Sequence, residues 1–246
     1  TGANSFIGSS FIRQLLEYGE TDIVATYRHN KEALVDPQTT RLKYVYCDLS
    51  NPKSVSQLFD ENNIGSIVHF AAARSGKTEE NFSSIADRDN IQPIKNLLKM
   101  AAKMDCKRFI FTSAIAVYDG MEKTENEFLE NVPLSPTSTF GQSKLACENL
   151  LRQYGGRLER VSLRLPGVHG PGKNKGVVYQ FLKAALYQTP LKITEPDSRF
   201  RLLFIKDAIQ SILLALREEL SDSYCCYNVA SSEIFNLVDL AKKILE

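Results

Sequence analysis

Glycines at positions 2 and 8 frame the first segment of the chain, residues 1–8 with the sequence TGANSFIG. From Ile7 onward apolar residues recur at the spacing of a helix, and Gly19 ends the run. Gly2 permits the positive φ angle of a tight turn between a strand and a helix, and Gly8 lets that helix lie close to a sheet. Amide groups at the head of such a helix attract phosphate. The pattern therefore predicts a diphosphate-binding turn, and a helix cap without a ligand is the alternative.

Strand and helix patterns alternate along the rest of the chain. Short runs rich in β-branched and aromatic residues predict strands over 22–27, 43–47, 66–70, 108–113 and 161–165, and helical spacing predicts helices over 54–61, 91–103 and 138–154. This alternation predicts an α/β fold, a Rossmann-type doubly wound parallel sheet with right-handed crossovers. The chain begins at the turn itself, so we expect a first strand to precede it, outside this sequence. A targeting peptide before that strand is an open alternative.

Charge and cysteine content argue against several classes of partner. Thirty lysines and arginines against 29 aspartates and glutamates leave no net attraction to nucleic acid or to a membrane surface, and no apolar run reaches membrane-spanning length. The five cysteines lack the paired spacing of a metal site, so we expect no metal. They fall mostly in apolar segments, which is typical of reduced thiols and predicts a cytoplasmic location.

Several segments, in their order along the chain, resemble motifs of one known protein family. Residues 1–8 resemble the Thr-Gly-x-x-Gly-x-x-Gly fingerprint of the extended short-chain dehydrogenase/reductases, the nucleotide-sugar epimerase/dehydratase family, with Ser5 in place of the middle glycine. The segments HFAA (69–72), FTSAIAVY (111–118), LRLPGVHGPG (163–172), RFRLLFIKDA (199–208) and YNVA (227–230) resemble later landmarks of that family in the same order. The resemblance covers essentially the whole chain. It implies a nicotinamide dinucleotide coenzyme and a nucleotide-sugar ligand.

The same resemblance implies a division into domains. We expect a dinucleotide-binding domain over 1–165 and a small discontinuous C-terminal substrate lobe over 166–201 and 231–246, with 202–230 returning to the main sheet. In relatives the helices corresponding to 91–103 and 138–154 form a dimer interface, so we expect a homodimer. Lys99, Lys103, Glu148 and Arg152 are expected on the exposed face of these helices.

Ligand contacts follow from the resemblance residue by residue. Coenzyme contacts are assigned to Gly2, Asn4, Ser5, Phe6, Ile7, Gly8, Arg28, Asp48, Leu49, Phe70, Ala71, Ala72, Asn90, Thr112, Lys144, Pro166 and Val168, and substrate contacts to Arg74, His169 and Arg201. A hydroxymethyl group at Ser5 is expected to weaken coenzyme binding, because the middle glycine of the fingerprint lets the backbone approach the diphosphate.

The residues at the end of the predicted strand 22–27 bear on which dinucleotide the site accepts. An acid there accepts a hydrogen bond from the adenine ribose 2′-hydroxyl, whereas a cation pairs with a 2′-phosphate. Residues 27–31, YRHNK, contain no acid. We therefore predict NADP(H) in preference to NAD(H), with Arg28 as the phosphate partner. The alternative is that Arg28 caps a surface loop.

The segment that resembles the catalytic motif departs from the family at two positions. The family uses a tyrosine, a lysine four residues later and a serine or threonine to move the substrate's proton. Here Lys144 is present, but Phe140 occupies the tyrosine position and has no ionisable hydrogen. The serine position falls on Ala114, next to Ser113. Loss of a general acid–base group typically lowers a rate by about 10²–10⁴-fold.

Other residues are candidates for the missing proton transfer. Ser113 could act if the strand end were shifted, and Tyr118, His69 and His169 can each carry a proton. The leading hypothesis is an NAD(P)-dependent nucleotide-sugar epimerase, dehydratase or reductase with an altered proton route, with Lys144, Ser113 and Tyr118 as its catalytic residues. The alternative is a catalytically silent protein that binds NADP(H) and a sugar nucleotide as a sensor or partner subunit.

Overall fold

The computed structural model describes residues 1–19, 22–29, 40–73, 85–121, 129–191, 193–194, 196 and 198–245. The strands are β1 (Ile23–Tyr27), β2 (Leu42–Tyr46), β3 (Ser66–His69), β4 (Arg108–Ala114), β5 (Glu159–Leu165), β6 (Gly167–His169), β7 (Leu202–Phe204) and β8 (Tyr224–Asn228). The helices are α1 (Phe6–Tyr18), α2 (Pro52–Asp60), α4 (Gln92–Lys103), α5 (Thr139–Gln153), α6 (Val177–Leu186), α7 (Ile205–Arg217) and α8 (Leu237–Leu245). A π-helical turn, η2 (Asp87–Ile91), leads into α4, and a 3-10 turn, η3 (Ile115–Tyr118), follows β4.

In the part of the chain that the structure describes, all paired strands are parallel. The largest sheet has the order β3-β4-β5-β8, β1 pairs with β2, and β6 pairs with β7. The first residues join two of these sheets. The Thr1 nitrogen donates to the Val68 carbonyl at 2.7 Å, and the Ala3 amide donates to the Thr26 carbonyl at 3.1 Å. The parallel α/β Rossmann-like fold predicted from the alternating pattern is confirmed.

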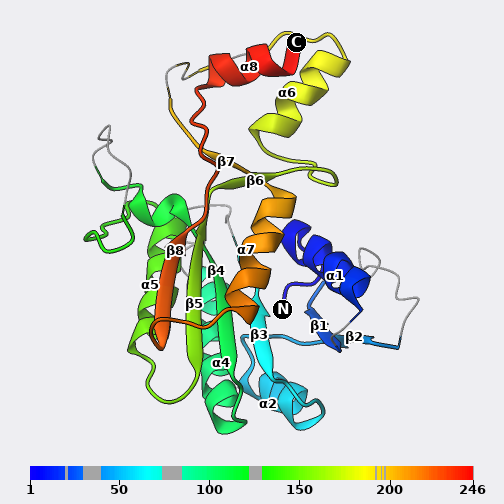
Figure 1. Ribbon diagram of the computed structural model, residues 1–246, viewed down its shortest axis with the longest axis vertical. Coiled ribbons are helices and arrows are strands. Elements are labelled where there is room, and N and C mark those ends of the chain that lie inside the picture. Colours follow the sequence, from blue (N-terminus) through cyan, green and yellow to red (C-terminus); the bar gives the residue numbers. More distant parts are fainter. Residues whose placement is uncertain are drawn as a thin grey trace.

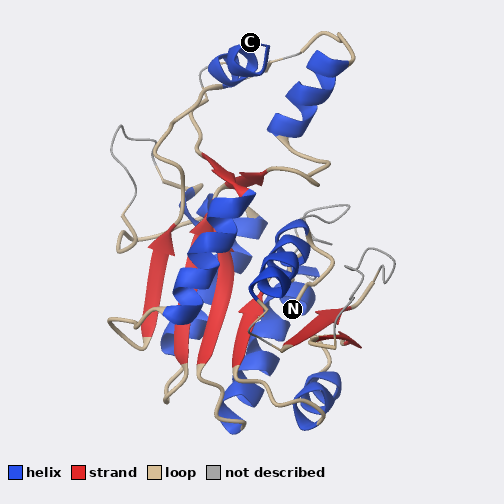
Figure 2. Ribbon diagram, turned by 45° about the vertical axis from the view of Figure 1, so that its right-hand side comes forward, coloured by secondary structure: helices blue, strands red, loops and turns tan. Residues whose placement is uncertain are grey.

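Helices cover both faces of the main sheet (Figures 1 and 2). On one face, α2, α4 and α5 bury a cluster that includes Phe59, Leu97, Phe109 and Leu151. On the other face, α1 and α7 pack over β4 and β5, with Phe11 and Ile212 in the interior. The residues of β4 from Arg108 to Ser113 are all buried, as expected for a strand covered on both faces, and its central residues Phe109, Ile110 and Phe111 are apolar.

A small lobe lies beyond the carboxyl ends of the main-sheet strands (Figure 2). It contains α6 and α8, whose contact buries Phe181, Leu240 and Ala241 together with Leu202 of β7. Within residues 202–230, β8 pairs with β5 of the main sheet and α7 packs against that sheet, whereas β7 pairs with β6. In open parallel sheets, ligands bind in the crevice at the carboxyl ends of the strands. The lobe therefore overhangs the edge where a ligand is expected.

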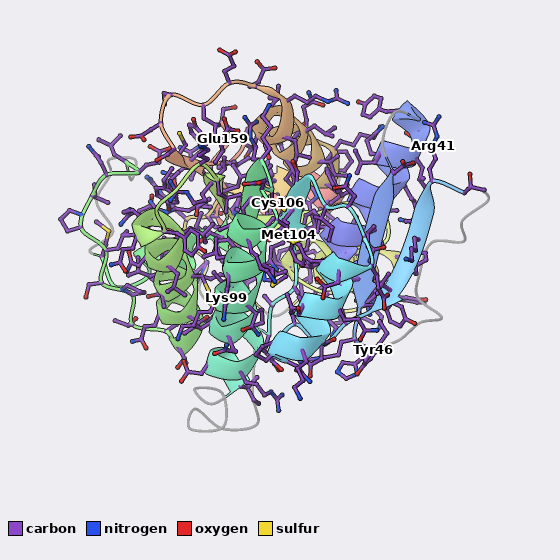
Figure 3. The ribbon with its side chains drawn as sticks, turned by 90° about the horizontal axis from the view of Figure 1, so that it is seen from below. Arg41, Tyr46, Lys99, Met104, Cys106 and Glu159 are labelled. Atoms are coloured by element: carbon purple, nitrogen blue, oxygen red, sulfur yellow. The ribbon has the colours of Figure 1, made fainter. Side chains whose placement is uncertain are left out.

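Figure 3 views the molecule from the opposite end, where Lys99, Cys106 and Glu159 are labelled. There Cys106 leads into β4 and donates to the Ile64 carbonyl, and Glu159 begins β5. Lys99 is exposed on α4, as expected for the predicted dimer face. Within the described ranges, no helix is both long enough and apolar enough to cross a membrane.

Candidate functional site

The head of α1 packs tightly against the end of β3. Gly2 has φ +71°, and a Cβ atom on it would lie 2.7 Å from the Ala71 nitrogen. A Cβ atom on Gly8 would lie 2.4 Å from the Gly2 carbonyl oxygen. Both positions therefore require glycine, one for its backbone angle and both for the close approach of neighbouring backbone.

Ser5 caps the helix that these glycines position. Its Oγ accepts a hydrogen bond from the Gly8 amide at 3.0 Å. The first turn of a helix has amides without partners inside the helix. Because Ser5 occupies the Gly8 amide, the amides of Phe6 and Ile7 remain to face an anion at this end.

A cavity of about 220 Å³ opens beside the turn. Its lining brings together eight of the predicted coenzyme contacts: Gly2, Asn4, Ser5, Arg28, Leu49, Phe70, Ala71 and Ala72. It also includes residues that the sequence did not single out: Thr26, Tyr27, His29, Cys47, Ser50, Ala73, Asp89 and Pro93. Four elements that are distant in sequence, β1, β2, β3 and η2, thus meet the head of α1 around one cavity.

Acidic groups surround Arg28 at this cavity. Nη1 and Nη2 of Arg28 donate to the two carboxylate oxygens of Asp89 at 2.7 and 3.2 Å, and Asp48 Oδ1 lies 3.8 Å from Nη1. The NADP(H) prediction depended on the absence of an acid from residues 27–31. That premise does not hold in three dimensions, because Asp48 and Asp89 reach the same place from other elements. The geometry around Arg28 therefore does not support the preference for NADP(H) predicted from the sequence.

Asn90 links the cavity wall to α5. Its side chain accepts from the Ala73 amide at 2.7 Å, donates to the Ala73 carbonyl at 3.1 Å and donates to Ser143 Oγ at 3.1 Å. These bonds hold the chain after β3 against the helix that carries Lys144. The described contacts of Asn90 thus position backbone, and its contact with a coenzyme stays a prediction.

Lys144 lies deeper, between β4 and α5. It is 5% exposed, and its ammonium donates to the Thr112 carbonyl at 2.8 Å. The same nitrogen lies 5.6 Å from the centre of the Phe140 ring and 4.6 Å from that of Phe111. Phe140 and Lys144 thus share one helix face, as their spacing predicts, but only one of them can exchange a proton.

Ser113 and Tyr118 belong to a buried polar network. Ser113 Oγ donates to Glu148 at 2.5 Å, and Arg164 pairs with the same carboxylate at 2.8 Å. The Tyr118 hydroxyl accepts from Arg164 and donates to Asn228 at 2.8 Å. Burial raises the pKa of Tyr118, although Arg164 opposes this effect. Both hydroxyls therefore bind neighbouring protein groups, and their catalytic roles stay predictions.

The position of Glu148 contradicts one expectation about which residues are exposed. We expected it on the exposed face of 138–154, but its side chain and that of Arg164 are both 0% exposed. The sequence held a signal for this burial, because Glu148 follows Lys144 by one helical turn and so shares its face.

Both histidine candidates have lowered pKa values. His69 is 1% exposed, and its Nδ1 lies 2.9 Å from Thr1 Oγ1. Burial is the main cause that holds the pKa of His69 well below its usual value. Burial also lowers the pKa of His169, whose ring lies 5.6 Å from that of Phe204. Neutral imidazole is therefore the expected form of both near pH 7.

The remaining predicted contacts lie around the lobe. Pro166 joins β5 to β6, and Val168 lies in β6. The Arg201 guanidinium donates to the carbonyls of Ser231 and Ser232, both at 2.8 Å. Arg74 falls outside the described residues. The structure thus leaves the three substrate contacts as predictions.

These features define a class of protein: an α/β protein with a parallel Rossmann-like sheet and a glycine turn beside a cavity at its carboxyl edge. Residues 1–230 match the profile of the family described as "NAD dependent epimerase/dehydratase family". The chain belongs to that family.

Two relatives illustrate the similarity in sequence. The chain is 28% identical over 157 residues to UDP-glucose 4-epimerase of Dictyostelium discoideum, a match that covers 62% of this chain and 45% of the relative. It is 31% identical over 192 residues to D-erythronate dehydrogenase of Cupriavidus necator, covering 74% of this chain and 58% of the relative. The chain thus spans about half the length of these two relatives.

A solved structure is similar along nearly the whole chain. The WbmG enzyme of Bordetella bronchiseptica, solved with NAD and UDP, superposes with a TM-score of 0.85 at 24% identity. The superposition covers 99% of this chain and 75% of that one. The likeness extends the fold assignment to the lobe, and the structural neighbour binds NAD.

Proposed function

We propose that the chain binds a nicotinamide dinucleotide at the head of α1 and a nucleotide sugar under the lobe. We propose further that it acts as an epimerase, dehydratase or reductase whose proton route differs from that of its family. The observation that carries this proposal is the junction of the Gly2 and Gly8 turn with the cavity that eight predicted contacts line.

The residues around the turn fit such a coenzyme. The amides of Phe6 and Ile7 suit a diphosphate, and Leu49 lies in the cavity wall where the adenine is expected. Lys144 is buried between β4 and α5, and we expect its ammonium to hold the nicotinamide ribose. When bound, the coenzyme would supply hydride transfer. The protein's part is to orient the two ligands, exclude water and move a proton at the sugar hydroxyl.

The residues at the positions expected to transfer protons favour a second function. Phe140 and Ala114 have no exchangeable side-chain proton, and the hydroxyls of Ser113 and Tyr118 bind Glu148 and Asn228. A catalytically silent protein that binds coenzyme and sugar nucleotide would retain these features. The homodimer and the cytoplasmic location stay predictions under either function.

Turnover separates the two functions. We expect the purified protein, supplied with NADH or NADPH or their oxidised forms and a panel of nucleotide sugars, to form product slowly. Lys144→Ala should abolish this activity, because the ammonium is expected to hold the ribose. Absorbance at 340 nm and product masses report reduction and dehydration, and chromatographic separation of the sugar epimers reports epimerisation. Turnover no greater than that of Lys144→Ala, with both ligands bound, would leave only the silent function.

Ser5 provides a test of binding at the turn. Ser5→Gly frees the Gly8 amide for the diphosphate, so we expect about tenfold tighter dinucleotide binding, the value of one weak charge-assisted hydrogen bond. Stability should fall by only a few tenths of a kcal/mol, because glycine is an acceptable helix cap. Titration calorimetry and thermal melting measure the two effects. Ser5→Ala, which also loses the cap but keeps a Cβ atom, is the matched control and should gain less. Unchanged or weaker binding by Ser5→Gly would contradict the expectation.

A further inference from the structure

Arg28 and Asp89 form a bidentate ion pair in the cavity wall. Arg28 follows β1 and is one-third exposed, whereas the Asp89 side chain on η2 is 8% exposed. The pair joins segments 61 residues apart, and both residues line the cavity. The Arg28 Nε also donates to His29 Nε2 at 3.0 Å. Three of the five N–H donors of the guanidinium are therefore engaged by neighbouring side chains.

Among the described residues, the charges at this end of the cavity balance. Asp89 also accepts from Arg88, with Nε and Nη2 each 3.0 Å from a carboxylate oxygen. Burial by itself raises the pKa of Asp89, but hydrogen bonds from Arg88 and Arg28 outweigh it and lower the pKa to about 2. Asp89 is therefore ionised near neutral pH. Two carboxylates, Asp48 and Asp89, offset the two guanidinium groups.

The backbone of η2 gives Asp89 this position. The π-helical turn over Asp87–Ile91 carries two adjacent side chains to different partners, Asp89 to Arg28 and Asn90 to Ala73. Single π-helical turns within or before α-helices occur frequently at functional sites. An acid on this turn thus reaches the end of β1, where the strand itself has none.

We propose that Asp89 determines which nicotinamide dinucleotide the protein accepts, by neutralising Arg28 so that the site favours the ribose 2′-hydroxyl of NAD(H) over the 2′-phosphate of NADP(H). The inference rests on the proposed coenzyme site. A ribose hydroxyl can donate to a carboxylate at this place, whereas a phosphate meets two carboxylates and a guanidinium that is already paired.

The experiment is a fluorescence titration of NADH and NADPH with the parent protein, Asp89→Asn and Asp87→Asn. Asp87 is an exposed acid on the same turn and so provides a matched control. We expect the parent to bind NADH at least tenfold more tightly than NADPH. Asp89→Asn should shift the ratio of the two Kd values at least tenfold toward NADPH, the value of a charge-assisted hydrogen bond. Asp87→Asn should leave the ratio within threefold.

A second step tests the partner. Adding Arg28→Gln to Asp89→Asn should remove the gain in NADPH binding, because the released guanidinium is its source. Tighter NADPH than NADH binding by the parent would overturn the inference, whether or not the variants fold. So would an unchanged ratio in Asp89→Asn. If the parent binds neither coenzyme, the proposed function fails and this inference fails with it, whereas binding with the wrong ratio overturns the inference alone.

Discussion

Phe140→Tyr combined with Ala114→Ser is expected to raise turnover of a nucleotide sugar by about 10²–10⁴-fold, the usual contribution of a general acid–base group. Phe140 lies in the first turn of α5 and Ala114 ends β4. The Lys144 ammonium is 5.6 Å from the Phe140 ring centre. A phenol at that position would lie beside a buried cation, which favours its ionised form. The missing proton carrier would then stand where the family has it.

Comparison of single and double variants measures this effect. Initial rates with a fixed coenzyme should rise for Phe140→Tyr and rise further when Ala114→Ser is added. Phe140→Leu is the matched control, because it alters the ring without adding a hydroxyl, and it should not raise the rate. If the double variant binds both ligands but turns over no faster than the parent, Phe140 and Ala114 are not what limits catalysis.

Glu148→Ala is expected to lower the free energy of unfolding by about 3–5 kcal/mol, because it leaves the Arg164 guanidinium buried without its counter-charge. Both side chains are fully buried, and they are joined by a 2.8 Å contact. The same substitution removes the acceptor of the Ser113 hydroxyl. Urea unfolding followed by circular dichroism gives the free energy.

Two comparisons isolate the buried charge. Glu233→Ala removes the exposed partner of Lys243, a pair with both side chains more than half exposed, and should change stability by about 0.5 kcal/mol or less. Replacing both buried partners, Glu148→Leu with Arg164→Met, should recover much of the loss, because no unpaired charge then remains. A loss below about 1 kcal/mol for Glu148→Ala would contradict the expected cost of an unpaired buried guanidinium.

Local pattern was sufficient to predict the main elements. Helical spacing over 138–154 corresponds to α5, Thr139–Gln153, and the apolar run over 108–113 corresponds to β4, Arg108–Ala114. The glycines of the first turn were predicted for the same reason, since a positive φ angle and a close backbone approach are demands that one residue type meets. The sequence also predicts that Phe140 replaces a catalytic tyrosine, because the position is counted from Lys144 within one helix.

Side-chain pairings across the fold could not be obtained in this way. Asp89 reaches Arg28 across 61 residues, and no local period links a π-helical turn to the end of a strand. The sequence by itself determined the order of the main strands and helices and the glycine turn, and it predicts the loss of proton carriers at positions 140 and 114, because these features depend on residues close together in the chain. Only the tertiary structure decided that Glu148 is buried and that the charge of Arg28 is balanced, because burial and long-range electrostatic contacts arise when distant segments pack together.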